Sequence, residues 1–187
     1  MGGGVQLYDY DNAPERDLIR RARRGDAKAF ARLYSDIYRD LYRFALCMLR
    51  HPQEAEDAVS EAVIVAYENL SLLRKESSFK SWIFTILNNE CRRALMKRGR
   101  ERKITDDADT YPGAAAAGAE PDYAQREDIR RALELLDEEE RMIVAFSVFG
   151  GYRSEEIAEM LNKNASSVRS RKKRALEKMR VSLGSTV

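Results

Sequence analysis

Basic residues crowd one predicted helix near the C-terminus. Between positions 169 and 180 a single acid, Glu177, stands among many cations. The cations are Arg169, Arg171, Lys172, Lys173, Arg174, Lys178 and Arg180. Neutralising backbone phosphates supplies much of the affinity of proteins for nucleic acid, so the chemistry that these side chains favour is DNA binding. The alternative is a solvated basic helix without a ligand.

The residues before this helix favour the DNA interpretation. A short helix is predicted after Ser154, a good N-cap, and Asn162 tolerates the left-handed conformation that a tight turn requires. Two helices joined in this way make a helix-turn-helix, whose second helix enters the major groove. Helical spacing predicts an inner face of Val168, Ala175, Leu176 and Met179. It predicts an outer face of Arg169, Ser170, Lys173 and Arg174.

The composition is that of a folded protein without a membrane span. Of the 187 residues, 44% are hydrophobic and 34% are charged, and the net charge is only +2. The local cluster, and not the whole-chain charge, therefore predicts nucleic-acid binding. No apolar run approaches the ~18 residues of a membrane helix, and residues 1–12 lack the apolar core of a signal peptide. We expect no membrane insertion and a cytoplasmic location.

Catalytic and metal-binding groups are not evident in the sequence. Cys47 and Cys91 fall on apolar helical faces, so we expect buried free thiols. His51 is the single histidine and no cysteine cluster accompanies it, so no zinc site is expected. No nucleophile and base share a readable spacing. The sequence therefore predicts neither an enzyme nor a cofactor.

Apolar residues at helical spacing predict an all-α protein of two small helical domains. Residues 1–14 form a tail and residues 15–100 form the first domain. Residues 101–122, rich in Ala, Gly, Pro and acids, are predicted to be a flexible linker, and residues 123–187 form the second domain. Helix boundaries are indicated by Gly25, Asp26, Pro52, Asp137, Gly150 and Gly151.

An acidic stripe marks the helix predicted after Pro52. Its outward residues are Glu56, Asp57, Glu61, Ile64 and Glu68. A stripe of acids is usually a solvated face, but an exposed branched apolar side chain beside charge suggests a protein partner. Both interpretations stay open from the residues alone.

A second surface is predicted on the helix that begins at about Phe79. Trp82, the single tryptophan, sits at the start of this helix. Outside its apolar stripe lie Lys80, Ser81, Phe84, Thr85, Asn88, Asn89, Arg92, Arg93 and Lys97. Rings stack on bases, amides bond base edges and arginines hold phosphates, so this mixture suits single-stranded nucleic acid. The alternative is that Trp82 and Phe84 belong to the core and that the arginines are only solvated.

Taken in order, these motifs resemble the extracytoplasmic-function (ECF) type of sigma factor of bacterial RNA polymerase, within the sigma-70 family. The first half resembles that family over residues 54–62 (EAEDAVSEA) and 79–89 (FKSWIFTILNN). The second half is similar to it over residues 132–141 (ALELLDEEER), 154–159 (SEEIAE) and 167–171 (SVRSR). The resemblance covers about residues 15–100 and 123–181.

The resemblance implies a transcription initiation factor. Its partners would be core RNA polymerase, through the β′ clamp helices and the β flap, promoter DNA, and an anti-sigma factor. The acidic stripe (Glu56, Asp57, Glu61, Ile64, Glu68) would bind the clamp helices. The −10 element would be captured as single strand by Lys80, Trp82, Asn88, Asn89, Arg92 and Arg93, with the loop before them. The −35 element would be read by Ser167, Arg169, Ser170, Arg171, Lys173 and Arg174.

Some positions depart from the family pattern. Tyr67 stands where Trp is frequent, Ser60 where Gln is usual, and Asn162 where the turn has Gly. These departures concern the promoter sequence and not the activity. Two rival functions remain: a sigma-like decoy that binds an anti-sigma factor without DNA, and a conventional helix-turn-helix regulator. The basic cluster argues against the first, and the two surfaces of the N-terminal half argue against the second.

Overall fold

The fold is entirely helical over the part of the chain described by a computed structural model, which is residues 8–73, 75, 79–104 and 123–184. The first half contains α1 (Glu15–Ala22), α2 (Ala27–Leu49), α3 (Pro52–Asn69), the 3₁₀ turn η1 (Leu70–Leu72) and α4 (Phe79–Ile104). The second half contains α5 (Tyr123–Glu134), α6 (Glu138–Val148), α7 (Ser154–Met160) and α8 (Ala165–Gly184). The prediction of an all-α protein is confirmed.

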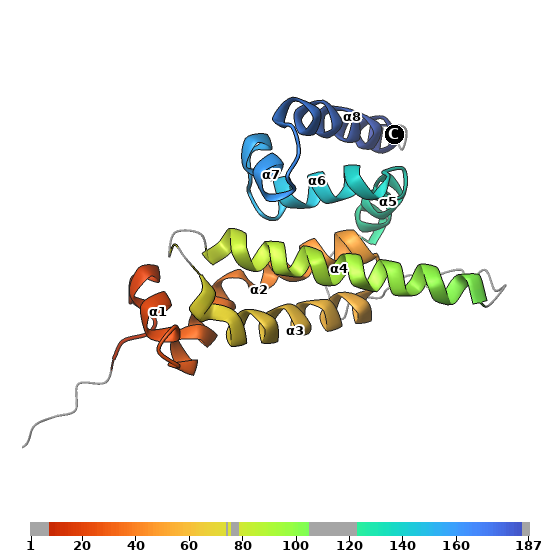
Figure 1. Cartoon of the computed structure of the whole chain (residues 1–187). Helices are drawn as coiled ribbons and strands as arrows, with labels where there is room; N and C mark the ends of the chain where they lie inside the picture. The colour runs from red at the N-terminus through yellow and green to blue at the C-terminus, as the bar shows by residue number, and fades with distance from the viewer. Residues whose placement is uncertain (1–7, 74, 76–78, 105–122, 185–187) are drawn as a thin grey trace, which may run out of the picture.

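Three long helices, α2, α3 and α4, form one layer, and α1 lies against the beginning of α2 (Figure 1). Their apolar faces meet in a core that includes Leu41, Met48, Ile83 and Leu87, all fully buried. Burying such faces, more than helix propensity, stabilises helices of this kind. This three-helix layer positions the outer faces of α3 and α4.

Local capping explains where the helices begin. The Asp26 carboxylate accepts hydrogen bonds from the backbone N–H groups of Lys28 and Ala29, both at 3.1 Å, and so caps α2. Asp137 and Glu140 form a reciprocal capping box at the start of α6. Pro52 opens α3. The starts predicted from these residues are confirmed.

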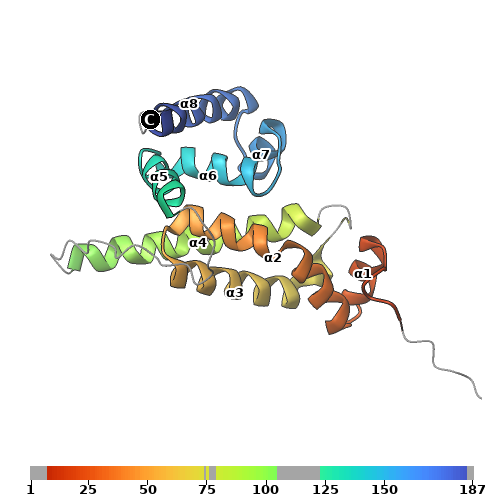
Figure 2. The same cartoon turned by 180° about the vertical axis from the view of Figure 1, so that it is seen from behind.

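The second domain stacks α8 on α6, with α5 and α7 beside them (Figure 2). The α6 helix lies between α8 and the first domain and packs on α2. Consequently α8 lies on the side of the molecule away from the three-helix layer. The charged face of α8 is therefore not covered by the first domain.

The two domains share a hydrophobic core, which the sequence did not predict. One continuous cluster of buried residues runs from Leu18 in α1 to Val168 in α8. Between the domains, the Phe44 ring of α2 and the Phe146 ring of α6 lie 4.8 Å apart. The α4 helix also continues to Ile104, beyond the predicted boundary at 100. Most of the predicted linker, from 105 to 122, and residues 1–7 of the predicted tail lie outside the described residues.

Candidate polymerase and nucleic-acid surfaces

The helix-turn-helix is built by short-range hydrogen bonds. Asn162 adopts the predicted left-handed conformation, with φ of 52°. The next residue, Lys163, donates its backbone N–H to the Ala158 carbonyl at 2.8 Å, which closes the turn. The Asn164 side chain then accepts a hydrogen bond from the Ser166 backbone N–H at 2.8 Å and caps α8. This geometry fixes the direction in which α8 leaves α7.

The outer face of α8 matches the prediction. Val168 and Ala175 are fully buried against α7, α6 and α5, whereas Arg169, Ser170, Lys173 and Arg174 are exposed, as is Ser167. Leu176, predicted to face inward, is 42% exposed. It follows Ala175, the residue that contacts the core, and so lies about 100° further around the helix. The inner face of α8 is therefore narrower than predicted.

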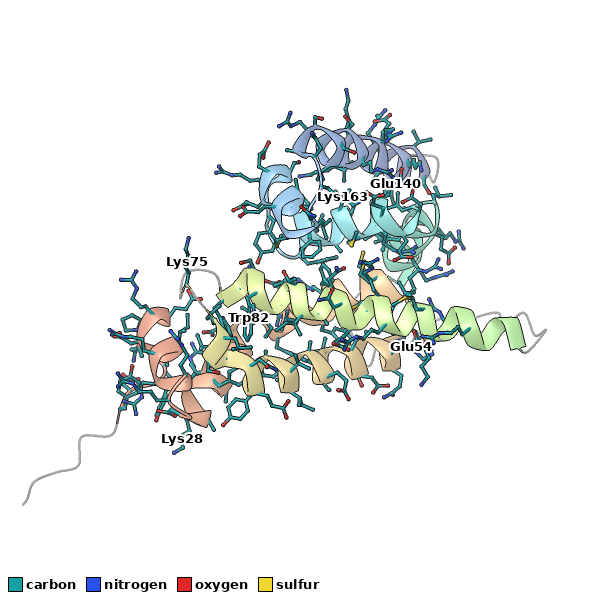
Figure 3. All side chains as sticks on the ribbon, viewed as in Figure 1. Lys28, Glu54, Lys75, Trp82, Glu140 and Lys163 are labelled. Carbon is teal, nitrogen blue, oxygen red and sulfur yellow. The ribbon has the colours of Figure 1, made fainter. Side chains whose placement is uncertain are left out.

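Some cations of α8 are exposed to solvent, and others form ion pairs with acids of the second domain. The Lys178 ammonium lies 2.6 and 2.8 Å from the buried carboxylate of Glu140. The Arg171 guanidinium lies 3.3 Å from Glu139 and 3.8 Å from Asp137, and is only partly exposed. Figure 3 shows Glu140 on α6, on the side facing α8. Arg171, expected among the −35 residues, thus pairs in the free protein with acids at the start of α6.

One positioning contact was missed from the sequence. The Glu155 carboxylate of α7 accepts a hydrogen bond from the Arg169 guanidinium at 2.6 Å, and this bond lowers the pKa of Glu155. It fixes the direction of an exposed arginine on the outer face of α8. Fourteen positions separate the two residues, so only the helix-turn-helix geometry itself could have indicated the pair.

The acidic stripe of α3 lies on the surface, as predicted. Glu56, Asp57, Glu61 and Glu68 are exposed, and Ile64 is 52% exposed beside them. Among the described residues, no cation lies within ion-pair distance of these four acids. Their charge is therefore available to an external partner.

A groove of about 710 Å³ separates the stripe from α4. Asp57 and Glu61 line one wall and Arg93 and Lys97 line the other. At one end of the groove the Arg98 guanidinium lies 3.2 Å from the Glu54 carboxylate and bridges the two helices. Arg93 thus points to the side of α4 that faces α3, where it pairs with Glu90 at 2.7 Å.

The predicted single-strand surface of α4 is only partly exposed. Asn89, Arg92 and Arg93 are exposed, and Lys80 and Trp82 are half-buried. Phe84, for which a core position was the alternative, is 0% exposed, and Asn88, predicted to face outward, is 3% exposed. The Phe84 ring lies 5.5 Å from the Phe44 ring of α2 and 5.9 Å from the Tyr152 ring of the second domain. The other half of the prediction concerned the loop before α4, of which residues 76–78 lie outside the described part.

Cys47 and Cys91 are buried free thiols, as predicted. Burial raises the pKa of each to about 12, so both stay protonated at neutral pH. Among the described residues no group of His, Cys, Asp and Glu is arranged to hold a metal ion. Nor does any described helix have the length and apolar character of a membrane span.

Comparison with known proteins accounts for both domains. Residues 33–101 match the family described as sigma-70 region 2, and residues 126–179 match sigma-70 region 4. The ECF RNA polymerase sigma-E factor of Escherichia coli is 30% identical over 173 residues, which cover 86% of this chain and 89% of that protein. This chain belongs to the sigma-70 family, as a sigma factor of the ECF type.

Further relatives agree with this assignment. The sigma factor is 29% identical to the RNA polymerase sigma-H factor of Pseudomonas aeruginosa over 174 residues, covering 87% of this chain and 90% of that protein. Its fold is similar to that of the sigma factor RpoE of Bartonella quintana, solved in complex with the anti-sigma factor NepR. The TM-score is 0.73, at 25% identity over 84% of this chain and 98% of that one. The protein is thus a transcription initiation factor and not an enzyme.

Proposed function

We propose that α3, α4 and α8 make three separate contacts during initiation. The acidic stripe of α3 (Glu56, Asp57, Glu61, Ile64, Glu68) docks on the β′ clamp helices of core polymerase. The observation that supports this most directly is the exposure of these four acids and of Ile64 along one side of α3. Complementary charge speeds the encounter of two proteins, and the exposed Ile64 side chain adds apolar contact at the centre of the stripe.

The α8 helix reads the −35 element as duplex. Arg169, Ser170, Lys173 and Arg174 face the major groove, and Ser167 lies beside the adjacent backbone. Arginine gives bidentate hydrogen bonds to guanine, and lysine serves as a guanine or phosphate contact. Arg171 acts through the second domain, because its ion pairs with Glu139 and Asp137 hold α8 on α6.

The α4 helix captures the −10 element as single strand. Asn89 offers an amide to a base edge, Arg92 and Arg93 bind phosphates, and Trp82 with Lys80 supports the flipped base at the start of the helix. Unstacking a base costs a few kcal/mol, which stacking and hydrogen bonds in the site offset. Asn88 belongs to the same set once α4 is uncovered.

Regulation follows the pattern of the relatives. We expect an anti-sigma factor to bind this chain, as NepR binds the Bartonella sigma factor. The second domain additionally contacts the β flap of polymerase. Because these partners include core polymerase and promoter DNA, we propose a cytoplasmic location.

Run-off transcription with purified core polymerase on a promoter library tests the proposal as a whole. The double variant Asp57→Lys/Glu61→Lys should bind core polymerase at least about tenfold more weakly, because like charges then face the docking site. The control is Glu15→Lys/Glu159→Lys, which reverses two exposed acids away from the stripe and should bind normally. If the folded stripe variant keeps its affinity, α3 is not the docking helix.

A further inference from the structure

A cluster of cations surrounds the turn that joins α1 to α2. Its exposed members are Arg16, Arg20, Arg23, Arg24 and Lys28. The opposite face of α1 is apolar and packs into the core, with Leu18, Ile19 and Ala22 buried. The α1 helix therefore presents a strongly basic face to solvent, and none of the three contacts proposed above uses it.

Backbone hydrogen bonds hold this turn in one conformation. The N–H group of Gly25 donates to the Ala22 carbonyl at 2.9 Å, and the N–H group of Asp26 donates to the Arg21 carbonyl at 3.2 Å. Gly25 has φ of 88°, in the region that favours glycine. The Asp26 side chain then caps α2. The cations on either side of Gly25 thus project from a fixed backbone.

Neighbouring carboxylates pair with other cations. Asp26 lies 2.8 Å from the Arg21 Nε atom and accepts a hydrogen bond from the Tyr10 hydroxyl at 3.0 Å. The Arg21 guanidinium is also held over the Tyr8 ring, 3.9 Å from its centroid. Asp17 pairs with Arg20.

Three cations of the cluster are left for an external anion. Among the described residues, no carboxylate forms an ion pair with Arg23, Arg24 or Lys28, which we call the basic turn. All three are exposed. Like charges gathered in this way repel one another and attract a polyanion. The basic turn is therefore suited to a ligand that carries several negative charges in a row.

The basic turn lies close to the start of α4. Phe30, two residues after Lys28, packs edge-to-face on Phe79, with 6.5 Å between the ring centroids. Phe79 in turn lies 6.5 Å from the Trp82 ring. Figure 1 shows α1 at the end of the three-helix layer where α4 begins, and Figure 3 shows Lys28 and Trp82 at that same end. A DNA strand held at Trp82 can therefore continue to the basic turn.

We propose that the basic turn binds backbone phosphates of the single-stranded promoter DNA immediately downstream of the −10 element. The proposal rests on the assignment of α4 to that element. The −35 element is upstream and belongs to α8 of the second domain, whereas α1 lies apart from that domain (Figure 1), which places this contact on the downstream side. Phosphate contacts position a strand without reading its sequence. The basic turn thus adds affinity for the melted strand and adds no base preference.

Neutral phosphates in the DNA test this contact directly. The probe is a fork-junction promoter DNA whose non-template strand extends four nucleotides beyond the −10 element, bound by holoenzyme. A second version carries methylphosphonates at those four positions. The methylphosphonates should weaken binding of the wild-type holoenzyme at least about tenfold, because the cations then lose their charged partners.

The variant Arg23→Ala/Arg24→Ala/Lys28→Ala should bind the natural fork about as weakly as the wild type binds the methylphosphonate fork. It should lose little more on the modified DNA. Its slope of log affinity against log salt should be smaller by about 2, since each phosphate of a single strand contributes about 0.7. The matched control, Arg39→Ala/Arg43→Ala, removes two exposed cations from the middle of α2 and should behave as the wild type on both forks.

Equal methylphosphonate effects in the wild type and the triple variant would overturn the proposal. So would a triple variant that binds core polymerase more weakly in the absence of DNA, because the basic turn would then contact protein. If the triple variant loses helical circular dichroism, Arg24→Gln/Lys28→Gln gives the same comparison with a smaller expected loss. An Asn89→Ala holoenzyme tests the assignment of α4 separately: normal binding of the fork would reject that assignment, whereas the methylphosphonate comparison still reports on the basic turn.

Discussion

The faces of α8 and α4, the two DNA-binding helices proposed here, are presented very differently by the free protein. The outer face of α8 points away from the rest of the molecule, and its cations are held in place by acids of α6 and α7. The face of α4 is divided: Asn89, Arg92 and Arg93 are exposed, whereas Phe84 and Asn88 are buried. The exposed face of α8 can bind duplex DNA without a rearrangement of the protein. Single-stranded −10 DNA exists only after polymerase has engaged the promoter. Burial of part of the α4 face therefore does not hinder binding before that point.

The largest effect is expected at Glu140, whose carboxylate holds α8 on α6 through Lys178. Glu140→Ala removes the buried carboxylate that pairs with Lys178 and that accepts a hydrogen bond from the Asp137 backbone N–H. Losing the charge-assisted bonds to the partly exposed Lys178 together with the capping-box bond should lower the free energy of unfolding by about 3 kcal/mol. Urea unfolding measures this loss. The adjacent Glu138→Ala, an exposed acid, should change stability by less than ~0.5 kcal/mol, and an equal loss in both variants would contradict the assigned role.

A second prediction concerns the covered side, where Cys47 lies on α2 near Arg141 of α6. The pKa of each thiol is raised from 9.0 to about 12 by burial. Above pH 9 the unfolded chain therefore releases protons that the folded chain keeps, and stability is lost as pH rises toward the folded pKa. Between pH 8 and pH 10 the two thiols should together cost roughly 2–3 kcal/mol of unfolding free energy. A Cys47→Ala/Cys91→Ala variant should lose correspondingly less over this interval, and identical losses would show that the thiols are hydrated.

Arg174 and Arg171 of α8 should differ in how they affect binding of the −35 duplex. Arg174→Ala should cost roughly 1–3 kcal/mol in −35 binding and relax the preference at one base pair. Arg171→Ala should instead loosen α8 from α6, with equal effects on matched and mismatched duplexes. Titration of both duplexes over a salt series distinguishes the two results. If Arg171→Ala alters base preference while Arg174→Ala does not, the DNA-facing side of α8 is misassigned.

The smallest effect is expected for Glu155→Gln. Both members of the Glu155–Arg169 pair are largely exposed, so the global stability should hardly change. The loss of alignment at Arg169 should reduce −35 affinity less than about fivefold, with the loss confined to the base that Arg169 contacts. Glu159→Gln, on the same helix, is the matched control and should bind all duplexes normally.

Features set by neighbouring residues were predictable from the sequence. Asp26, Asp137 and Asn162 act within a few positions of themselves, and each behaves as the capping and turn rules require. A core position for Phe84 was one of the two alternatives, but its contact with Tyr152, 68 positions along the chain, was not predictable. The ion pairs of Arg171 with Glu139 and Asp137 likewise join residues more than thirty positions apart. Helical periodicity identifies one apolar face, but it cannot say whether a second face will be covered by another domain.

The acids that hold α8 in place also affect its response to salt. In the free protein, carboxylates of this chain already lie beside Arg169, Arg171, Lys178 and Arg180. Those cations must give up a carboxylate partner before they can neutralise a DNA phosphate and release its condensed cation. Among the described residues, no carboxylate forms an ion pair with Lys172, Lys173 or Arg174. Each phosphate neutralised with full counterion release contributes about 0.9 to the slope of log affinity against log salt. The helix should therefore bind DNA with a salt dependence nearer to that of three charges than of the seven that its sequence displays, and should keep more of its −35 affinity as ionic strength rises.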